Sequence, residues 1–363
     1  MKRKIVKPAF DTTHLSFILK GLSVGILTGF VVSLFRIGIE RSLHLWTRLY
    51  QIFPTYPWIV LVVILINSFL AVIIGIIVRS QPYIMGSGIP QVEGQLAGEL
   101  QMDWWSILWR KFVTGVLGIG AGLFLGREGP SIQLGAAVGQ GLAQGLKNTG
   151  TSQRVLIASG SAAGLSAAFN APIAGTLFVL EEIYHNFSPF VWMASLAGAI
   201  GADFVSSNFF GLRPVLQMND IRSLPLYLYW HLIVLGIILG ILGYMYQRTL
   251  LAMPRWYTGF NRLPRPFHGL VPLLLVIPIG ILRQQTLGGG NTVILGMAHV
   301  TPGLMILSGL FVLRYIFSMI SYGSGLPGGI FLPILSLGAI LGAVYGTFMS
   351  ELGWLPSRHG EWQ

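Results

Sequence analysis

Long apolar segments separated by short polar ones run through almost the whole chain. About 20 apolar residues in a helix cross a bilayer, so this pattern predicts an all-α, polytopic membrane protein. Glycine or proline interrupts many segments, and broken helices of this kind indicate a transporter or channel whose irregular backbone lines a cavity at mid-membrane. The segments fall near residues 17–39, 58–79, 107–125, 154–184, 190–210, 226–250, 269–283, 303–322 and 328–349.

Composition agrees with this class and narrows it. The chain is 53% hydrophobic and only 10% charged, whereas soluble domains carry about 25% charged residues. No long polar run exists, so we expect no cytoplasmic regulatory domain. The net charge is +11. Its basic residues cluster in short loops and in the N-terminal MKRKIVK, as in cytoplasmic segments, so we expect a cytoplasmic N-terminus in a plasma (inner) membrane and no nucleic-acid partner.

The residue types that enzymes use most are missing or scattered. The chain has no cysteine, which excludes disulfides, thiolate metal sites and cysteine nucleophiles. Its seven histidines show no metal-ligand spacing. No nucleophile–base pair and no phosphate-loop lysine motif is present. The sequence therefore predicts neither an enzyme nor a metal or cofactor site.

One internal repeat is visible. The segment GREGPSIQLGAAVG (126–139) aligns without gaps to GIFLPILSLGAILG (329–342), at an offset of 203 residues. A repeat of half-chain size is typical of duplicated, often inverted, transporter folds. It predicts a first inverted repeat over 1–211 and a second over 212–363. The first copy runs on for 56 residues from Gly126 to Glu182, so its counterpart would reach about residue 385, and we expect the second repeat to be incomplete at its C-terminal end.

Three short motifs share one design: glycines, a turn, then a proline that opens a helix. Proline suits the first helical position, where its missing N–H costs nothing, and glycine lets the backbone turn tightly and approach a ligand. The N–H groups of a helix start form a ready anion site. Each motif alone is explained as a helix start that closes a loop; three together favour an anion site. They comprise Gly86, Ser87, Gly88, Ile89 and Pro90; Gly126, Arg127, Glu128, Gly129 and Pro130; and Gly329, Ile330, Phe331, Leu332 and Pro333.

Serine hydroxyls are the candidate side-chain donors to the anion. Ser87 lies inside GSGIP, and Ser324 lies inside a similar GSGLP stretch at 323–327. Ser324 comes immediately before the GIFLP turn and can serve only to shape it. We therefore prefer Ser87.

Glu128 is a carboxylate placed between glycines in a stretch that is otherwise apolar. A carboxylate beside an anion site can occupy that site when it is charged, and it can leave when it is protonated. Burial disfavours its charged form and helix N-termini favour that form. Glu128 is thus a candidate gate and proton acceptor in one residue. The alternative is a structural ion pair with Arg127.

Two further carboxylates, Glu181 and Glu182, end the apolar run FNAPIAGTLFVLEE. Adjacent residues on a helix point about 100° apart, so the two need not share a face. An ionisable residue at the end of an apolar helix is a functional candidate. At a membrane interface it is equally well explained as a solvated group.

The motifs GSGIP, GREGP and GIFLP, together with AGLSAAFNAPIAGTLFVLEE, resemble the CLC family of chloride channels and proton-coupled chloride transporters in order, content and separation. The resemblance spans essentially the whole chain. It implies a homodimer in the lipid membrane with one anion pathway per subunit, built from two inverted repeats, with the three motifs as the selectivity filter.

The resemblance also implies roles for single residues. Ser87 would supply a hydroxyl to chloride, and the backbone N–H groups of Ile330 and Phe331 would be further ligands. Glu128 would be the external gate. Glu182 would be the internal proton-transfer glutamate, with Glu181 as its neighbour. Channel members usually lack an acid at the Glu182 position, so its presence favours coupled exchange.

The chain also departs from the family pattern. Members usually continue after GIFLP with further helices, one of which carries a tyrosine that coordinates the anion. Tyr345 is too close to GIFLP to be that residue. Three hypotheses follow: a chloride/proton antiporter that carries chloride and protons, a passive gated chloride channel, and a truncated member without transport activity.

Overall fold

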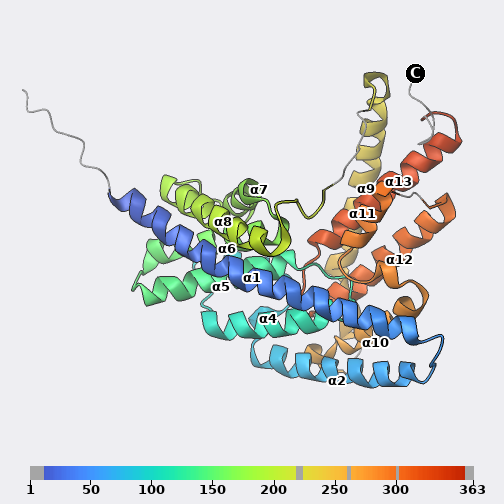
Figure 1. The fold of residues 1–363 in the computed structure, drawn as a ribbon, viewed down its shortest axis with the longest axis horizontal. Helices are drawn as coiled ribbons and strands as arrows, with labels where there is room; N and C mark the ends of the chain where they lie inside the picture. The colour runs from blue at the N-terminus through green and yellow to red at the C-terminus, as the bar shows by residue number, and fades with distance from the viewer. Residues whose placement is uncertain (1–11, 218–223, 260–262, 300–301, 356–363) are drawn as a thin grey trace, which may run out of the picture. The chain divides into compact units, whose positions relative to one another are not determined.

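The computed structural model describes residues 12–217, 224–259, 263–299 and 302–355, and within them the chain is almost wholly helical (Figure 1). The helices before the second half are α1 (Thr12–Ile52), α2 (Ile59–Ser80), η1 (Pro82–Ile84), α3 (Ile89–Ala97), α4 (Trp104–Gly120), α5 (Glu128–Gly145), α6 (Gly150–Phe169), α7 (Pro172–Phe178), η2 (Val179–Ile183) and α8 (Pro189–Phe210). They are followed by η3 (Leu226–Leu228), α9 (Trp230–Thr258), η4 (Arg265–Phe267), α10 (Leu270–Leu282), η5 (Gln284–Thr286), α11 (Asn291–His299), α12 (Leu304–Gly323) and α13 (Phe331–Glu351).

Seven helical segments among the described residues are long and apolar enough to cross a membrane. This confirms the predicted class, an all-α polytopic membrane protein. The segments are Thr13–Ile52, Ile59–Ser80, Pro189–Phe210, Leu226–Thr258, Arg265–Leu282, Leu304–Gly323 and Phe331–Glu351.

Two observed helices differ from the apolar segments that predicted them. The first runs to Ile52 rather than ending near residue 39; at about 1.5 Å per residue it is longer than the hydrocarbon core is thick, so its charged second half need not lie in hydrocarbon. The segment near 154–184 divides at Asn170, which takes a left-handed conformation (φ 55°, ψ 49°), before Pro172 opens α7. Asparagine tolerates this conformation, and proline cannot continue the preceding helix.

One compact unit comprises residues 1–34, 89–109 and 131–213. Its centre is α6, which packs against α7 and α8 and is buried from Val155 to Ala168. Small residues allow the close approach of backbones there. A Cβ placed on Gly139 of α5 would overlap the carbonyl oxygen of Leu156, and one on Gly160 would overlap that of Gly135.

The second compact unit comprises residues 35–88, 110–130 and 214–363. Within it α2 packs on α10, and α12 packs on both α9 and α13. The buried Asn67 of α2 donates a hydrogen bond of 2.7 Å to the carbonyl oxygen of Leu273 on α10. The compact units do not follow the division at residue 211, because compactness reflects packing whereas a repeat is a relation between sequence segments. The repeat boundaries stay a prediction.

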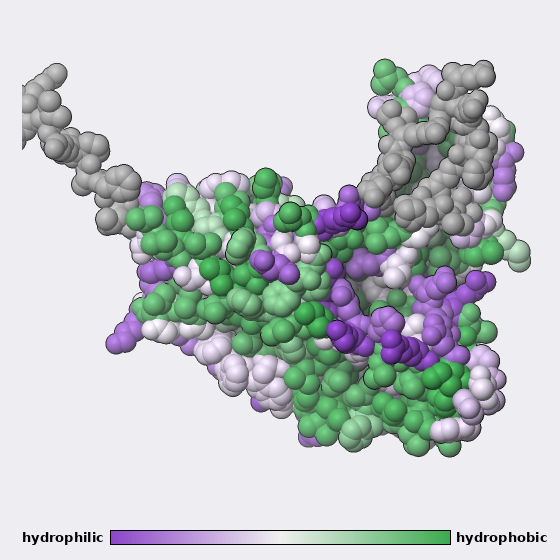
Figure 2. Space-filling model, in the orientation of Figure 1, coloured by the Kyte–Doolittle hydropathy of each residue, from purple (hydrophilic) through white to green (hydrophobic). Residues whose placement is uncertain are grey.

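The outward faces of the helices are apolar, and Figure 2 shows hydrophobic residues over much of the face in view. Trp58 is 65% exposed, Phe69 on α2 is also 65% exposed, and Ile233 on α9 is 67% exposed. In water such faces would be costly. They are expected where lipid tails surround the helices.

Candidate anion site

The three glycine-containing turns meet within the second compact unit. Gly126 and Gly329 each donate the backbone N–H to the other's carbonyl oxygen, at 2.7 Å in both directions. A Cβ on Gly129 would lie 2.8 Å from the Cβ of Ser87, and one on Gly329 would lie 3.2 Å from the nitrogen of Gly129. Glycine is required at 129 because the backbone approaches its neighbour so closely.

Each turn leads into a helix, as the motifs predict. The helices begin at Ile89, Glu128 and Phe331. The predicted place of proline at the first helical position is wrong: Pro90 is the second helical residue, and Pro130 and Pro333 are the third. Proline is tolerated at these positions for the same reason, since none of the first four N–H groups of a helix has an intrahelical acceptor.

Ser87 lies in the first turn between two glycines with left-handed backbones, Gly86 (φ 62°) and Gly88 (φ 89°), and it is buried. The alternative candidate, Ser324, makes local hydrogen bonds at the end of α12. The Ser324 hydroxyl donates to the carbonyl oxygen of Ser321 at 2.7 Å and accepts the N–H of Leu326 at 3.4 Å. This local use fits the expectation that Ser324 only shapes its turn.

The carboxylate of Glu128 lies at the junction of the turns, 2% exposed. Its own backbone N–H and that of Leu332 donate hydrogen bonds to it. Its Oε2 atom has no hydrogen-bond partner among the described residues, and a Cβ on Gly126 would overlap that oxygen. Two helix starts, those of α5 and α13, therefore hold a single carboxylate where an anion would be stabilised.

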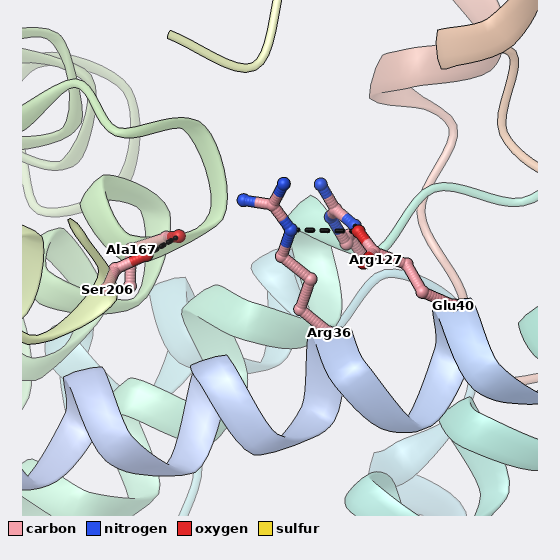
Figure 3. A network of polar contacts seen from close by, with 5 residues as sticks. All are labelled: Arg36, Glu40, Arg127, Ala167 and Ser206. Atoms are coloured by element: carbon pink, nitrogen blue, oxygen red, sulfur yellow. Dashed lines mark hydrogen bonds and ion pairs between the residues drawn. The ribbon is translucent and has the colours of Figure 1, made fainter. Parts of the chain in front are cut away.

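The carboxylate partner of Arg127 is Glu40 on α1 (Figure 3). The Oε1 atom of Glu40 accepts from Nη1 of Arg127 and from Nε of Arg36, at 2.9 Å in both cases. Glu40 thus compensates the charge of Arg127. Arg127 therefore does not need Glu128 as a structural ion-pair partner. Arg127 still lies close enough to act electrostatically on Glu128.

Lys111 on α4 is a site residue that the motif analysis missed. It is fully buried, and its ammonium group donates to the carbonyl oxygens of Ile84 and Gly86, at 2.8 Å each. A buried ammonium group is costly unless its hydrogen bonds are satisfied. Lys111 therefore holds the backbone of the turn that carries Ser87.

Arg314 on α12 makes the matching arrangement in the second half of the chain. It follows Lys111 by the same 203 residues that separate the two repeat copies and is 1% exposed. Its guanidinium donates to the carbonyl oxygens of Thr286 at 2.9 Å and Gly289 at 2.6 Å, and to the Ser336 hydroxyl at 2.8 Å. The repeat offset, extended to charged positions, is the sequence signal that pairs these two cations.

Glu181 and Glu182 lie in the other compact unit, on the π-helical turn η2, and both are exposed. π-Helical turns within helices occur frequently at functional sites. Exposure also suits the solvated explanation, so both interpretations stand. Tyr345 forms a 2.7 Å hydrogen bond with the buried His231 instead, in keeping with the expectation that it is not the family's anion ligand.

The chain is similar to known membrane transporters along nearly its whole length. The family described as voltage gated chloride channel matches residues 69–359. The H(+)/Cl(-) exchange transporter ClcA of Citrobacter koseri is 32% identical over 362 residues, covering 97% of this chain and 76% of the relative. The ClcA of Vibrio parahaemolyticus is 32% identical over 349 residues, covering 93% and 74%.

Two solved structures of transporters have folds similar to that of this chain. A slow cyanobacterial Cl-/H+ antiporter matches with a TM-score of 0.86 and 31% identity, covering 93% of this chain and 80% of that chain. A CLC-type fluoride/proton antiporter matches with a TM-score of 0.73 at 23% identity, covering 94% of this chain and 82% of that chain. The latter likeness concerns the fold alone.

Proposed function

Because the chain belongs to the voltage gated chloride channel family, we propose that it exchanges chloride for protons across a membrane. The observation that carries the proposal is the Glu128 carboxylate, held between the starts of α5 and α13 where the three turns meet. A group that is an anion when charged and neutral when protonated can alternate there with chloride.

The proposed cycle moves protons and chloride in opposite directions across the membrane. A proton from the outer solution binds the Glu128 carboxylate and removes its charge. The neutral side chain leaves the helix starts, and chloride takes its place with the Ser87 hydroxyl and the N–H groups of Ile330 and Phe331 as donors. The proton then passes to the inner solution by way of Glu182, with Glu181 beside it. The returning Glu128 carboxylate releases the chloride, which entered from the inner solution, to the outer solution.

The three turns form the selectivity filter in this proposal, and neutral donors dominate it. Helix starts and hydroxyls bind a small anion without a full countercharge, so the anion can leave again.

Each subunit of a homodimer would carry one such pathway. The positive residues of MKRKIVK favour a cytoplasmic N-terminus, and in this proposal the protein resides in the plasma (inner) membrane.

The test is a flux assay with the purified chain in liposomes, recording chloride efflux and proton uptake together. We expect coupled flux in the parent, loss of proton movement with persistent chloride flux in Glu182→Gln, and loss of proton coupling in Glu128→Ala. Glu181→Gln decides which of the adjacent acids transfers the proton, and Glu99→Gln, at an exposed position, is the control.

Two outcomes would overturn the exchange mechanism. Chloride flux without proton movement in the parent identifies a passive gated channel. No flux from folded, membrane-inserted protein identifies a chain that carries the filter motifs but does not transport.

A further inference from the structure

The hydroxyl of Tyr322 lies against the turn that carries Ser87. Tyr322 is the penultimate residue of α12. The Cβ position of Gly86 is 3.5 Å from the Tyr322 hydroxyl oxygen and 3.8 Å from the ring carbon that bears it. The phenol therefore faces the residue that directly precedes Ser87.

Backbone hydrogen bonds fix this contact. The N–H of Gly86 donates to the carbonyl oxygen of Gly325 at 3.4 Å, and the N–H of Gly328 donates to that of Gly86 at 2.9 Å. The N–H of Gly325 donates to the carbonyl oxygen of Tyr322 at 3.0 Å. The end of α12 and the Ser87 turn are thus tied together, so the hydroxyl is held beside the turn by the fold.

Tyr322 belongs to a row of hydroxyl groups on one face of α12, with Ser318 one turn and Tyr315 two turns before it. The other two have hydroxyl partners on α9. Tyr315 bonds to Thr249 at 3.0 Å, and Ser318 contacts the hydroxyl of Tyr246 at 3.4 Å.

The Tyr322 hydroxyl differs from the rest of this row. No hydrogen bond to it is found among the residues that the structure describes, and its side chain is half-buried. The hydroxyl oxygen itself is not fully buried, so water or an ion can reach it. A hydroxyl without a hydrogen-bond partner, next to a turn built for an anion, is available to donate to a ligand.

We propose that Tyr322 supplies a hydroxyl donor to the transported anion beside Ser87. A phenol O–H donates one hydrogen bond and adds no charge, so it strengthens anion binding without trapping the anion. The inference rests on the proposed function for the identity of the anion. The expected ligand set from sequence contained Ser87, Ile330 and Phe331 and no tyrosine of the described chain.

The test is Tyr322→Phe, which removes one oxygen and leaves the ring in place. Chloride binding to the detergent-solubilised protein is measured by titration calorimetry at constant ionic strength, with gluconate as the replacing anion. A net hydrogen bond contributes about 1 kcal/mol, so we expect chloride to bind about fivefold more weakly. Tyr315→Phe is the matched control, because the same change on the same helix removes a hydroxyl that already bonds to Thr249.

Two results would overturn the assignment: parental affinity in Tyr322→Phe, or an equal loss in Tyr315→Phe. A second measurement is the flux ratio of chloride to thiocyanate, which should fall in Tyr322→Phe because thiocyanate depends less on hydrogen-bond donors. Calorimetry does not require transport, so a parent that binds chloride without coupled flux contradicts only the exchange function. A parent that binds no chloride contradicts both.

Discussion

Gly126 and Gly329 exchange two backbone hydrogen bonds of 2.7 Å each, although 203 residues separate them. They are equivalent positions of the internal repeat, so the contact is reciprocal, as at a two-fold axis. Backbone atoms alone make it, and it brings the starts of α5 and α13 to the same carboxylate. The Oε2 atom of Glu128 occupies the space that a Cβ on Gly126 would need.

Gly126→Ala should therefore displace the Glu128 carboxylate. We expect the proton flux of the exchange assay to fall by roughly tenfold or more, because small displacements of a reacting group have effects of this size. Gly145→Ala, at the C-terminal end of α5, is the control, since no described atom lies within 4 Å of a Cβ there. Parental proton flux in Gly126→Ala would contradict the idea that the carboxylate needs this space.

Glu40→Gln should change the pH profile of transport more than it changes stability. Its carboxylate is 49% exposed, so the ion pair contributes about 1 kcal/mol or less to folding. Without it, the uncompensated charge of Arg127 favours the charged form of Glu128. The pH of half-maximal chloride flux should then shift to lower values. Glu351→Gln, at the exposed end of α13, should leave the profile unchanged; a shift to higher pH in Glu40→Gln would contradict this reasoning.

Lys111→Met should destabilise the protein and weaken chloride binding together. The change leaves the carbonyl oxygens of Ile84 and Gly86 without the donor that they share. Removing one partner of a buried hydrogen bond, so that the other is left unsatisfied, costs about 1–3 kcal/mol. The midpoint of thermal unfolding in detergent and the chloride affinity report the two effects. Lys147→Met, at an exposed position, should alter neither, and an unchanged midpoint in Lys111→Met would count against a holding role.

Equivalent glycines of the two repeat copies should respond differently to substitution. A Cβ on Gly139 meets the backbone of Leu156, whereas one on Gly342, 203 residues later, meets no described atom within 4 Å. We expect Gly139→Ala to destabilise the protein by about 1–3 kcal/mol through overpacking. Gly342→Ala should be neutral or stabilising by up to about 1 kcal/mol, because alanine favours helices. Thermal unfolding of the two variants gives the comparison, and equal effects would contradict it.

The sequence by itself determined the membrane class, the positions of most helices and the three turns. These features depend on local patterns: apolar length sets a membrane-crossing helix, and glycine followed by proline sets a turn and a helix start. The repeat offset also comes from local patterns, because it is found by comparing two short segments of the sequence. It predicted the correspondence of Gly126 with Gly329, and it would have paired Lys111 with Arg314 had charged positions been included.

Only the tertiary structure decided which side chains meet. The partner of Arg127 is Glu40, 87 residues earlier in the chain, and Tyr322 faces Gly86 from a helix in the other half of the sequence. No periodicity encodes such pairs, because they depend on how helices pack and on where the backbone leaves carbonyl groups to be satisfied. A buried lysine or a half-buried tyrosine has the same one-letter code as a solvated one, and the packing around it determines what it can bind.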